Sequence, residues 1–110
     1  MGDDIFESAV HPDGGYAAVF EQEEYTAYFY LCDLNRPEDE RIVAALPVNR
    51  RFQGAENNAI SVRWSNDGDL AGLFLKEDLL VVFNLAVARH DPEVSGRTAW
   101  NGDEARFVPS

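Results

Sequence analysis

Apolar and polar positions alternate with a period of two over two long stretches of this chain, about residues 5–47 and 59–90. Successive side chains of a strand point to opposite faces, so this period predicts half-buried β-strands. Each stretch reads as strand, Asp-Gly turn, strand, charged turn and strand. An Asp-Gly pair between apolar runs is a strong hairpin signal, because glycine adopts a positive φ at no steric cost. The pattern therefore predicts two antiparallel β-meanders.

The two meanders resemble each other residue by residue. HPDGGYAAVF, residues 11–20, aligns with SNDGDLAGLF, residues 65–74, at a constant offset of 54. Further along, CDL at 32–34 aligns with FNL at 83–85 at an offset of 51, so the first copy has three additional residues in its charged turn, EQEEYT. We therefore expect a pseudo-repeat within a single domain that spans residues 1–110.

The alternation also marks a candidate core. We expect an all-β fold in which the two pseudo-repeated meanders pack as a small sandwich or a half-open barrel, so that each sheet buries one apolar face. In the strand over residues 25–34 the pattern leaves open which face is inward, and Tyr28 and Tyr30 are the alternative to Phe29 and Leu31. The core candidates are Phe20, Phe29, Leu31, Ile60, Val62, Trp64, Phe74, Val82 and Phe83.

The segment NRPEDERIVAALPV, which follows the first meander, is ambiguous. Pro37 and the three acidic residues after it favour the first turn of a helix that ends before Pro47. Ile42 and Val43, however, are β-branched and the apolar run is short, which favours a strand. We expect a fourth strand here, with a short helix near 37–46 as the alternative.

The remaining segments are rich in turn residues. Residues 48–58 have no clear period and are interpreted as a connector between the two copies. In the tail, residues 91–110, the pairs Asp-Pro, Ser-Gly and Asn-Gly separate short apolar runs. We expect one short strand around Arg97 to Trp100 and another at ARFV, residues 105–108.

Charge narrows the range of partners. The 110 residues include 9 Lys and Arg against 20 Asp and Glu, a net charge of −11. Such a field repels phosphate backbones and anionic lipids, and it attracts basic proteins at rates that fall with salt. We therefore expect no direct nucleic-acid binding and no membrane binding. The charge either steers a basic partner or only keeps the protein soluble.

Cysteine usage and the first residues bear on location. Cys32 is the single cysteine and cannot form an internal disulfide. The start of the chain, MGDDIFESAV, is acidic where a signal peptide is basic, and no apolar run has the length of a membrane span. We expect a cytoplasmic protein, either a monomer or a homodimer.

The repeated motifs resemble two known patterns. WSNDGDLAGLFLKEDLLVVFNL resembles one blade of a β-propeller, but two copies cannot close a ring, because propellers need about four blades or more. VFE at 19–21, YFY at 28–30 and W-S-x-D-G at 64–68 are similar to a short, acidic, uncharacterised bacterial family. Ala27 and Asn84 depart from that pattern, which has Gly and Asp there. The resemblance implies a fold shared among bacteria and brings no catalytic residues.

Groups suited to catalysis or metal binding are sparse. Cys32 with His11 or His90 as its base is the pairing that would activate a thiol, but a cysteine inside an apolar strand is more often a small buried hydrophobe. The two histidines lack a spaced third ligand for zinc and are interpreted as exposed loop residues. Asp13 and Asp67 are interpreted as turn formers, since no twelve-residue calcium loop surrounds them. We expect no enzymatic activity, no cofactor and no metal.

Acidic side chains at the two charged turns provide a candidate site. We expect Glu21 to Glu24 and Glu77 with Asp78 to lie on one rim, where they are either ordinary charges at hairpin tips or a docking surface for a basic protein. Tyrosines at 25, 28 or 30 would supply aromatic anchors of the kind that interfaces favour. The candidate partner-binding residues are Glu21, Glu23, Glu24, Tyr25, Tyr28, Glu77 and Asp78.

These features favour a non-enzymatic, acidic protein-binding module. The most concrete form of this hypothesis is a bacterial immunity or antitoxin-like protein that inhibits a basic partner such as a toxin. The alternative is a small-molecule-binding or enzymatic domain with a pocket near Cys32 and Tyr30.

Overall fold

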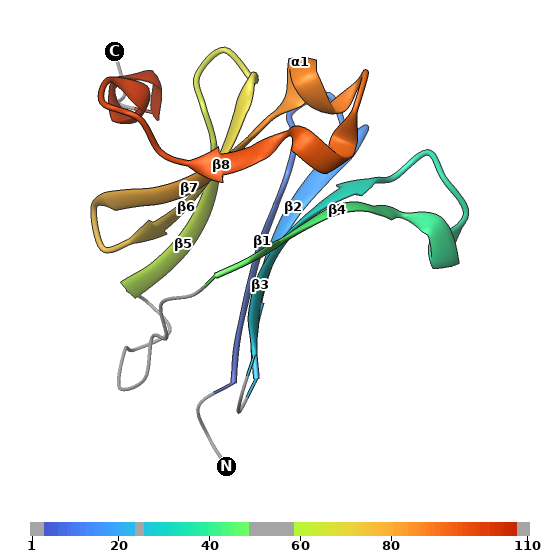
Figure 1. Ribbon diagram of the computed structural model, residues 1–110, viewed down its shortest axis with the longest axis horizontal. Coiled ribbons are helices and arrows are strands. Elements are labelled where there is room, and N and C mark those ends of the chain that lie inside the picture. Colours follow the sequence, from blue (N-terminus) through green and yellow to red (C-terminus); the bar gives the residue numbers. More distant parts are fainter. Residues whose placement is uncertain (1–3, 24–25, 49–58, 108–110) are drawn as a thin grey trace.

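Two four-stranded antiparallel sheets make up the protein, each with its strands in chain order. Figure 1 shows the computed structural model, which describes residues 4–23, 26–48 and 59–107. Sheet A contains β1 to β4 and sheet B contains β5 to β8. The strands are β1 Ile5–Val10, β2 Tyr16–Gln22, β3 Ala27–Asp33, β4 Ile42–Pro47, β5 Ile60–Trp64, β6 Leu70–Leu75, β7 Asp78–Asn84 and β8 Gly96–Thr98.

Helical segments are short and lie between strands or after them. The 3-10 turn η1, Glu38–Glu40, precedes β4, while α1, Leu85–Ala88, and η3, Pro92–Val94, connect β7 to β8. The segment near 37–46 therefore forms the expected strand, and its helical alternative is reduced to η1. The C-terminal turn η4, Asp103–Phe107, follows β8.

Equivalent backbone hydrogen bonds close the first turn of each copy. The N–H of His11 donates to the carbonyl of Tyr16 at 2.7 Å. At the offset of 54, the N–H of Ser65 donates to the carbonyl of Leu70 at 2.8 Å. These bonds close the two Asp-Gly turns in the same way, so both copies begin with the same hairpin.

The repeat also includes the fourth strand of each sheet. The N–H of Asp33 donates to the carbonyl of Arg41 at 2.8 Å, just before β4. The N–H of Asn84 donates to the carbonyl of Ser95 at 2.8 Å, just before β8. The second copy therefore continues to residue 98, beyond the limit of about 90 that the alternation predicted. The short strand expected around Arg97 is β8.

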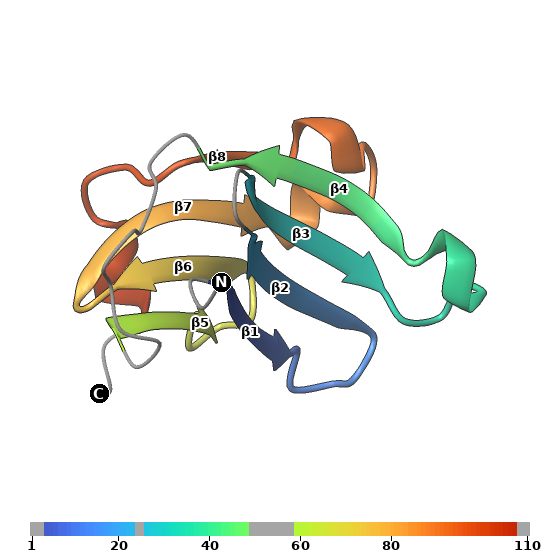
Figure 2. The same ribbon diagram turned by 90° about the horizontal axis from the view of Figure 1, so that it is seen from below.

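The two sheets stack in the same orientation, as neighbouring blades of a β-propeller do. In Figure 2, β1 lies beside β5 and β4 beside β8, so the strand order runs the same way in both sheets. Phe20 and Leu31 of sheet A point toward sheet B and belong to the shared core. Their repeat equivalents, Phe74 and Val82, belong to a separate cluster on the far face of sheet B. The sheets thus pack head to tail as a small sandwich.

The shared core lies between the inward faces of the two sheets. Phe29 and Phe83 stack across it, with ring centroids 5.0 Å apart. Both side chains are almost fully buried. All nine core candidates are buried except Trp64, which is partly buried and packs against the core. Tyr28 and Tyr30 are half-buried on the opposite face of β3, so Phe29 and Leu31 are the inward pair.

The far face of sheet B is covered by η4. Phe107 of η4 packs edge-on against Phe74, with ring centroids 5.1 Å apart. Gly72 allows this close approach, since a Cβ there would lie 2.8 Å from Cζ of Phe107. The strand expected over residues 105–108 is wrong as far as residue 107, because the positive φ of Gly102, 96°, ends the extended run and a 3-10 turn follows.

Candidate functional site

The face of sheet A that points away from sheet B is mostly apolar. Strand pairing arranges its side chains in three rows that each cross all four strands. Glu21 is the one charged member of these rows. The rows, together called the outer face of sheet A, are Phe6, Glu21, Tyr28 and Pro47; Ser8, Val19, Tyr30 and Ala45; and Val10, Ala17, Cys32 and Ile42.

Large apolar side chains on this outer face are open to solvent. Phe6 is 63% exposed, Val10 58% and Ile42 59%. Ile60, the repeat equivalent of Phe6, is only 2% exposed because sheet A covers it. Single exposed apolar residues are common, but a contiguous apolar face usually marks an interaction site.

Tyrosines occupy the middle of the outer face. The rings of Tyr28 and Tyr30 are stacked, with centroids 5.8 Å apart. Burial raises the pKa of Tyr30, and the neighbouring Glu21 and Tyr28 raise it further. Glu21 is also the cross-strand partner of Tyr28. The phenol of Tyr30 therefore stays protonated at neutral pH, available as a hydrogen-bond donor beside a carboxylate.

The acidic turns do not share one rim. Glu21 and Glu23 belong to the β2–β3 hairpin of sheet A, while Glu77 and Asp78 belong to the β6–β7 hairpin of sheet B. Figure 1 shows the end of β2 and the start of β3 at the lower centre and the turn between β6 and β7 at the left edge, and Figure 2 also shows these places apart. The expectation of a joint acidic rim is therefore wrong, because the strands of the two sheets cross. Two further candidates, Glu24 and Tyr25, lie outside the described residues.

Cys32 is half-buried on the outer face. Burial raises the pKa of its thiol, and nearby Arg41 opposes the shift. In the part of the chain that the structure describes, no hydrogen bond joins the thiol to His11 or His90. A thiol with a raised pKa carries little thiolate at neutral pH and is a poor nucleophile.

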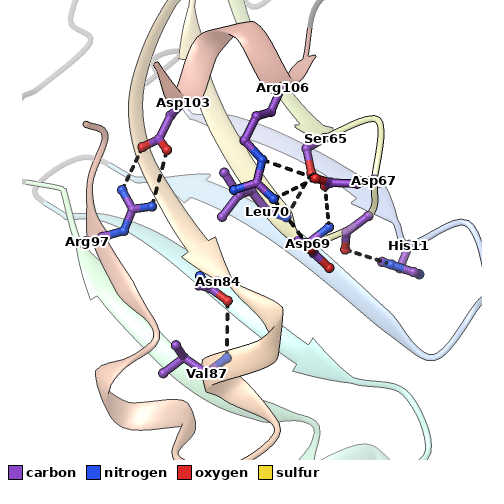
Figure 3. A network of polar contacts seen from close by, with 11 residues as sticks. His11, Ser65, Asp67, Asp69, Leu70, Asn84, Val87, Arg97, Asp103 and Arg106 are labelled. Atoms are coloured by element: carbon purple, nitrogen blue, oxygen red, sulfur yellow. Dashed lines mark hydrogen bonds and ion pairs between the residues drawn. The ribbon is translucent and has the colours of Figure 1, made fainter. Parts of the chain in front are cut away.

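His11 connects the two copies and is not exposed as expected. Its side chain is only 10% exposed, while His90 is exposed. The Nε2 atom lies 3.0 Å from the carbonyl oxygen of Gly68, across the two Asp-Gly turns (Figure 3). The Nδ1 atom accepts the backbone N–H of Asp13 at 3.1 Å and also contacts its carboxylate. The imidazole ring packs edge-on against Trp64, with ring centroids 4.7 Å apart. His11 therefore has a structural role.

Asp67 organises the second Asp-Gly turn. Its carboxylate accepts the hydroxyl of Ser65 at 2.6 Å and the backbone N–H of Asp69 at 3.0 Å (Figure 3). Arg106 of η4 donates to it at 2.7 Å. These hydrogen bonds, that of Ser65 first, lower the pKa of Asp67 to about 2. Its interpretation as a turn former is confirmed, and it also fastens η4 to sheet B.

A second ion pair holds η4 from its other side. The carboxylate of Asp103 accepts the guanidinium of Arg97 at 2.7 Å and the backbone N–H of Trp100 at 2.6 Å. Arg97 in turn lies over the indole of Trp100, 3.6 Å from the ring centroid. The bond from Arg97 lowers the pKa of Asp103 despite its burial. Both networks therefore hold η4 against sheet B.

The free edge of β4 borders a groove. This groove, with a volume of about 340 Å³, is called the β4 groove. Neither Cys32 nor Tyr30 lines it, although both lie on the neighbouring strand β3. The groove is lined by Ile42, Val43, Ala44, Ala45 and Glu93.

Two other features, a cluster of metal ligands and a membrane-spanning helix, are absent from the described residues. Among them, no group of three or more His, Cys, Asp or Glu side chains is placed to hold a metal ion. None of their helices is long and apolar enough to cross a membrane.

Comparison with known proteins places the chain in a family. The family described as "Uncharacterized protein conserved in bacteria (DUF2251)" matches residues 1–104. The chain belongs to the DUF2251 family. The resemblance to an uncharacterised bacterial family is thereby confirmed. No curated protein and no solved structure matches this DUF2251 chain. The family assigns no activity, so function has to be argued from the geometry.

Sequence reasoning missed the exposed apolar residues of this DUF2251 protein. Phe6 and Val10 show the same alternation as Ile60 and Trp64, and alternation alone predicts a buried face for all four. The signal that identifies them is the number of copies. A stack of two sheets has two terminal faces, and repeat proteins need a cap on each. Here η4 caps one terminal face, and the other is the outer face of sheet A.

Proposed function

We propose that this protein is a non-enzymatic binding module that docks a basic protein on the outer face of sheet A. One observation carries the proposal. Phe6 is 63% exposed, while its repeat equivalent Ile60 is 2% exposed beneath a neighbouring sheet. The same structural position is thus covered in one copy and open in the other, and a bound partner would cover the open one.

The charge of the chain supports a basic partner. A net charge of −11 speeds encounter with a cationic protein and repels nucleic acid. Glu21 lies within the outer face and Glu23 at its end, so carboxylates border the apolar side chains. The class that we propose is a cytoplasmic immunity or antitoxin-like inhibitor, whose acidic surface covers the basic site of a toxin.

Apolar anchors supply the affinity in this proposal. A buried aromatic side chain removes roughly 150–250 Å² from water, at about 25 cal/mol per Å². Since Phe6 is 63% exposed, covering what remains open would contribute roughly 2–4 kcal/mol before the costs of association. Tyr28 and Tyr30 already stack on each other, so little side-chain entropy is lost when they are covered.

Affinity capture with matched variants tests the proposal. The wild-type protein, Phe6→Ser and the control Val87→Ser are used as baits in lysate of the native host at low and moderate salt. Val87 is an exposed apolar residue on α1, away from the outer face. We expect a basic protein that elutes as salt rises, that is retained by Val87→Ser and that is lost with Phe6→Ser. A folded bait that captures no basic protein, or capture that Phe6→Ser leaves intact, refutes the proposal.

The alternative of a small-molecule site near Cys32 and Tyr30 stays a prediction. It is tested by a metabolite screen for ligands that raise the melting temperature. A ligand whose shift disappears in Cys32→Ser and Tyr30→Phe would support it. A screen without any shift would rule against it.

A further inference from the structure

The edge of sheet A points to a more specific mode of docking. We propose that the partner supplies an extended basic segment, which pairs with β4 as a fifth strand of sheet A alongside the β4 groove. This inference rests on the proposed function, because it takes the partner to be a basic protein. It specifies that the partner binds through an extended strand and that this chain binds through the backbone of β4.

The register of β4 shows which backbone groups are unpaired. The N–H of Val48 donates to the carbonyl of Ala27 at 2.9 Å, which makes these two residues a hydrogen-bonded pair. Hydrogen-bonded and non-bonded pairs alternate along an antiparallel ladder. Three residues back from Val48, Ala45 lies opposite Tyr30 in a non-bonded pair. The N–H and C=O of Ala45 therefore point away from β3, toward the free edge.

Pro47 fits the same reading of the edge. It lies opposite Tyr28, two residues from Ala45, so its backbone nitrogen also points outward. Proline has no N–H, and in sheets it is confined to positions like this one, where no ladder bond is lost. Within the described residues, no hydrogen bond is found to the N–H of Ala45. The donor of Ala45 and the carbonyl of Pro47 are thus available to an incoming strand.

The edge strands differ in length, since β1 and β4 have six residues, β5 has five and β8 has three. On the opposite edge of sheet A, β1 includes the charged residue Glu7 and packs against β5, while β4 packs against η3 and β8. In sheet B, the edge strand β8 has only three residues. The strand β4 has six, in the sequence IVAALP. Natural edge strands are usually protected by charges, proline or bulges. The strand β4 has no charged residue, and Pro47 and the register shift opposite Cys32 leave residues 44–46 as its regular stretch.

Charge around the groove selects a basic occupant. Glu93 lines the groove and is exposed. The three acidic residues of η1, Glu38–Glu40, lie just before β4 and are also exposed. In the described ranges, no ion pair involves Glu93 or these three residues. Arg41 is a positively charged residue close to these acidic side chains. Its Nε atom donates to the carbonyl of Arg36 at 3.0 Å.

The same charges disfavour a second copy as the occupant. Pairing β4 with β4 of another molecule would bring two chains of net charge −11 together, with the acidic residues of η1 on both sides. Like charges at an interface slow association and cost affinity. A groove of about 340 Å³ is at the lower end of ligand-binding cavities, which suits a single extended segment.

The first test uses a defined probe and the wild-type protein. The probe is a synthetic nine-residue peptide of alternating Lys and Val, made unmethylated and in two forms that are N-methylated at every second amide, in opposite registers. Binding is followed by amide NMR of the protein. We expect shifts centred on Ala45 and its neighbours in β4. One N-methylated form should lose at least tenfold in affinity and the other should bind, because only one edge of an added strand bonds to β4.

The second test changes the protein. Ala45→Pro removes the outward N–H without removing a bond to β3, as Pro47 already does two residues along. We expect at least tenfold weaker peptide binding, and a loss of about 2–5-fold for Glu93→Gln that disappears at high salt. The control Val87→Ser should bind as the wild type does, because Val87 does not line the β4 groove. If Ala45→Pro does not fold, the N-methylated peptides decide the question on the wild-type chain.

The outcomes separate this inference from the proposed function. Absence of peptide-induced shifts on β4, or equal binding of both methylated forms, overturns strand addition. A dimer in sedimentation of the wild type that Ala45→Pro converts to a monomer overturns it as well, because a second copy is then the occupant. If Phe6→Ser abolishes capture of a basic protein while Ala45→Pro does not, the binding module stands and strand addition falls. If both variants abolish capture and the peptide shifts map to β4, both proposals are supported.

Discussion

The head-to-tail stacking of the two sheets predicts that equivalent residues of the two copies differ in their contribution to stability. Phe6 and Ile60 occupy the same position of the repeat, yet Ile60 is 2% exposed in the shared core and Phe6 is 63% exposed. Truncating each side chain to alanine is therefore a matched pair of perturbations. Ile60→Ala should destabilise the protein strongly and Phe6→Ala should not.

The expected magnitudes follow from burial. Ile60→Ala removes three buried carbons, at about 0.8 kcal/mol each, and leaves a cavity, so we expect a loss of about 3–4 kcal/mol. Phe6→Ala removes a side chain with roughly a third of its surface in contact, and we expect a loss of about 1 kcal/mol. For a domain of this size the melting temperature should fall by roughly 12–20 °C for Ile60→Ala and about 4 °C for Phe6→Ala.

Urea unfolding measures both losses. The fluorescence of Trp64, which packs against the core, reports the transition, and the midpoints are compared at equal slope. Equal losses for the two variants would refute the head-to-tail arrangement as the state of the free monomer. A melting temperature that rises with protein concentration would then show that a second copy covers Phe6. Concentration-independent melting would show that the two sheets bury equivalent faces.

Three further predictions concern η4, the second Asp-Gly turn and the cysteine. Phe107→Ala should cost about 3 kcal/mol in urea unfolding, because Phe107 is the side chain that packs on Phe74 beneath η4. The pKa of Asp67 is about 2 in the folded protein against an ordinary value of 3.8, so its contribution to stability is present above about pH 4 and is lost as the pH falls through 2. Because its side chain is 48% exposed, we expect only about 1 kcal/mol, measured as the extra pH dependence of the wild type over Asp67→Asn; identical profiles would contradict this account. The raised pKa of the Cys32 thiol predicts that iodoacetamide alkylates it more slowly at pH 7 than it alkylates free cysteine, and an equal or faster rate would contradict the structure.

Local signals in the sequence were enough to predict the strands and their turns. The two Asp-Gly turns place Gly14 and Gly68 at positive φ, 83° and 77°, as the hairpin reading requires. The short strand β4 was favoured over a helix because Ile42 and Val43 are β-branched, and this preference was correct. Each of these features depends on residues close in sequence, which is why periodicity and turn chemistry could identify them.

The arrangement of the sheets depends on contacts between distant residues and was not predictable from the pattern. Phe6 and Ile60 have the same alternation and opposite environments, because only Ile60 has another sheet above it. The tail shows the same limit. The run at residues 105–108 reads as a strand by composition, but the ion pairs of Arg106 and Asp103 fix a 3-10 turn over sheet B. The acidic residues of the candidate site were assigned to one rim because the crossing of the two sheets leaves no trace in the sequence.

The two sheets stack head to tail, so the two terminal faces of the stack are different, and η4 covers one of them. The face of sheet B beneath η4 is the repeat equivalent of the face with which sheet A packs on sheet B. A chain ending before residue 100 would expose that face, and it would match the outer face of sheet A in the next molecule. Heterologous contacts that do not close build open filaments. The five residues of η4, fastened by Arg106 and Asp103, cover the face on which a further sheet would stack, so we expect a chain truncated before residue 100 to polymerise.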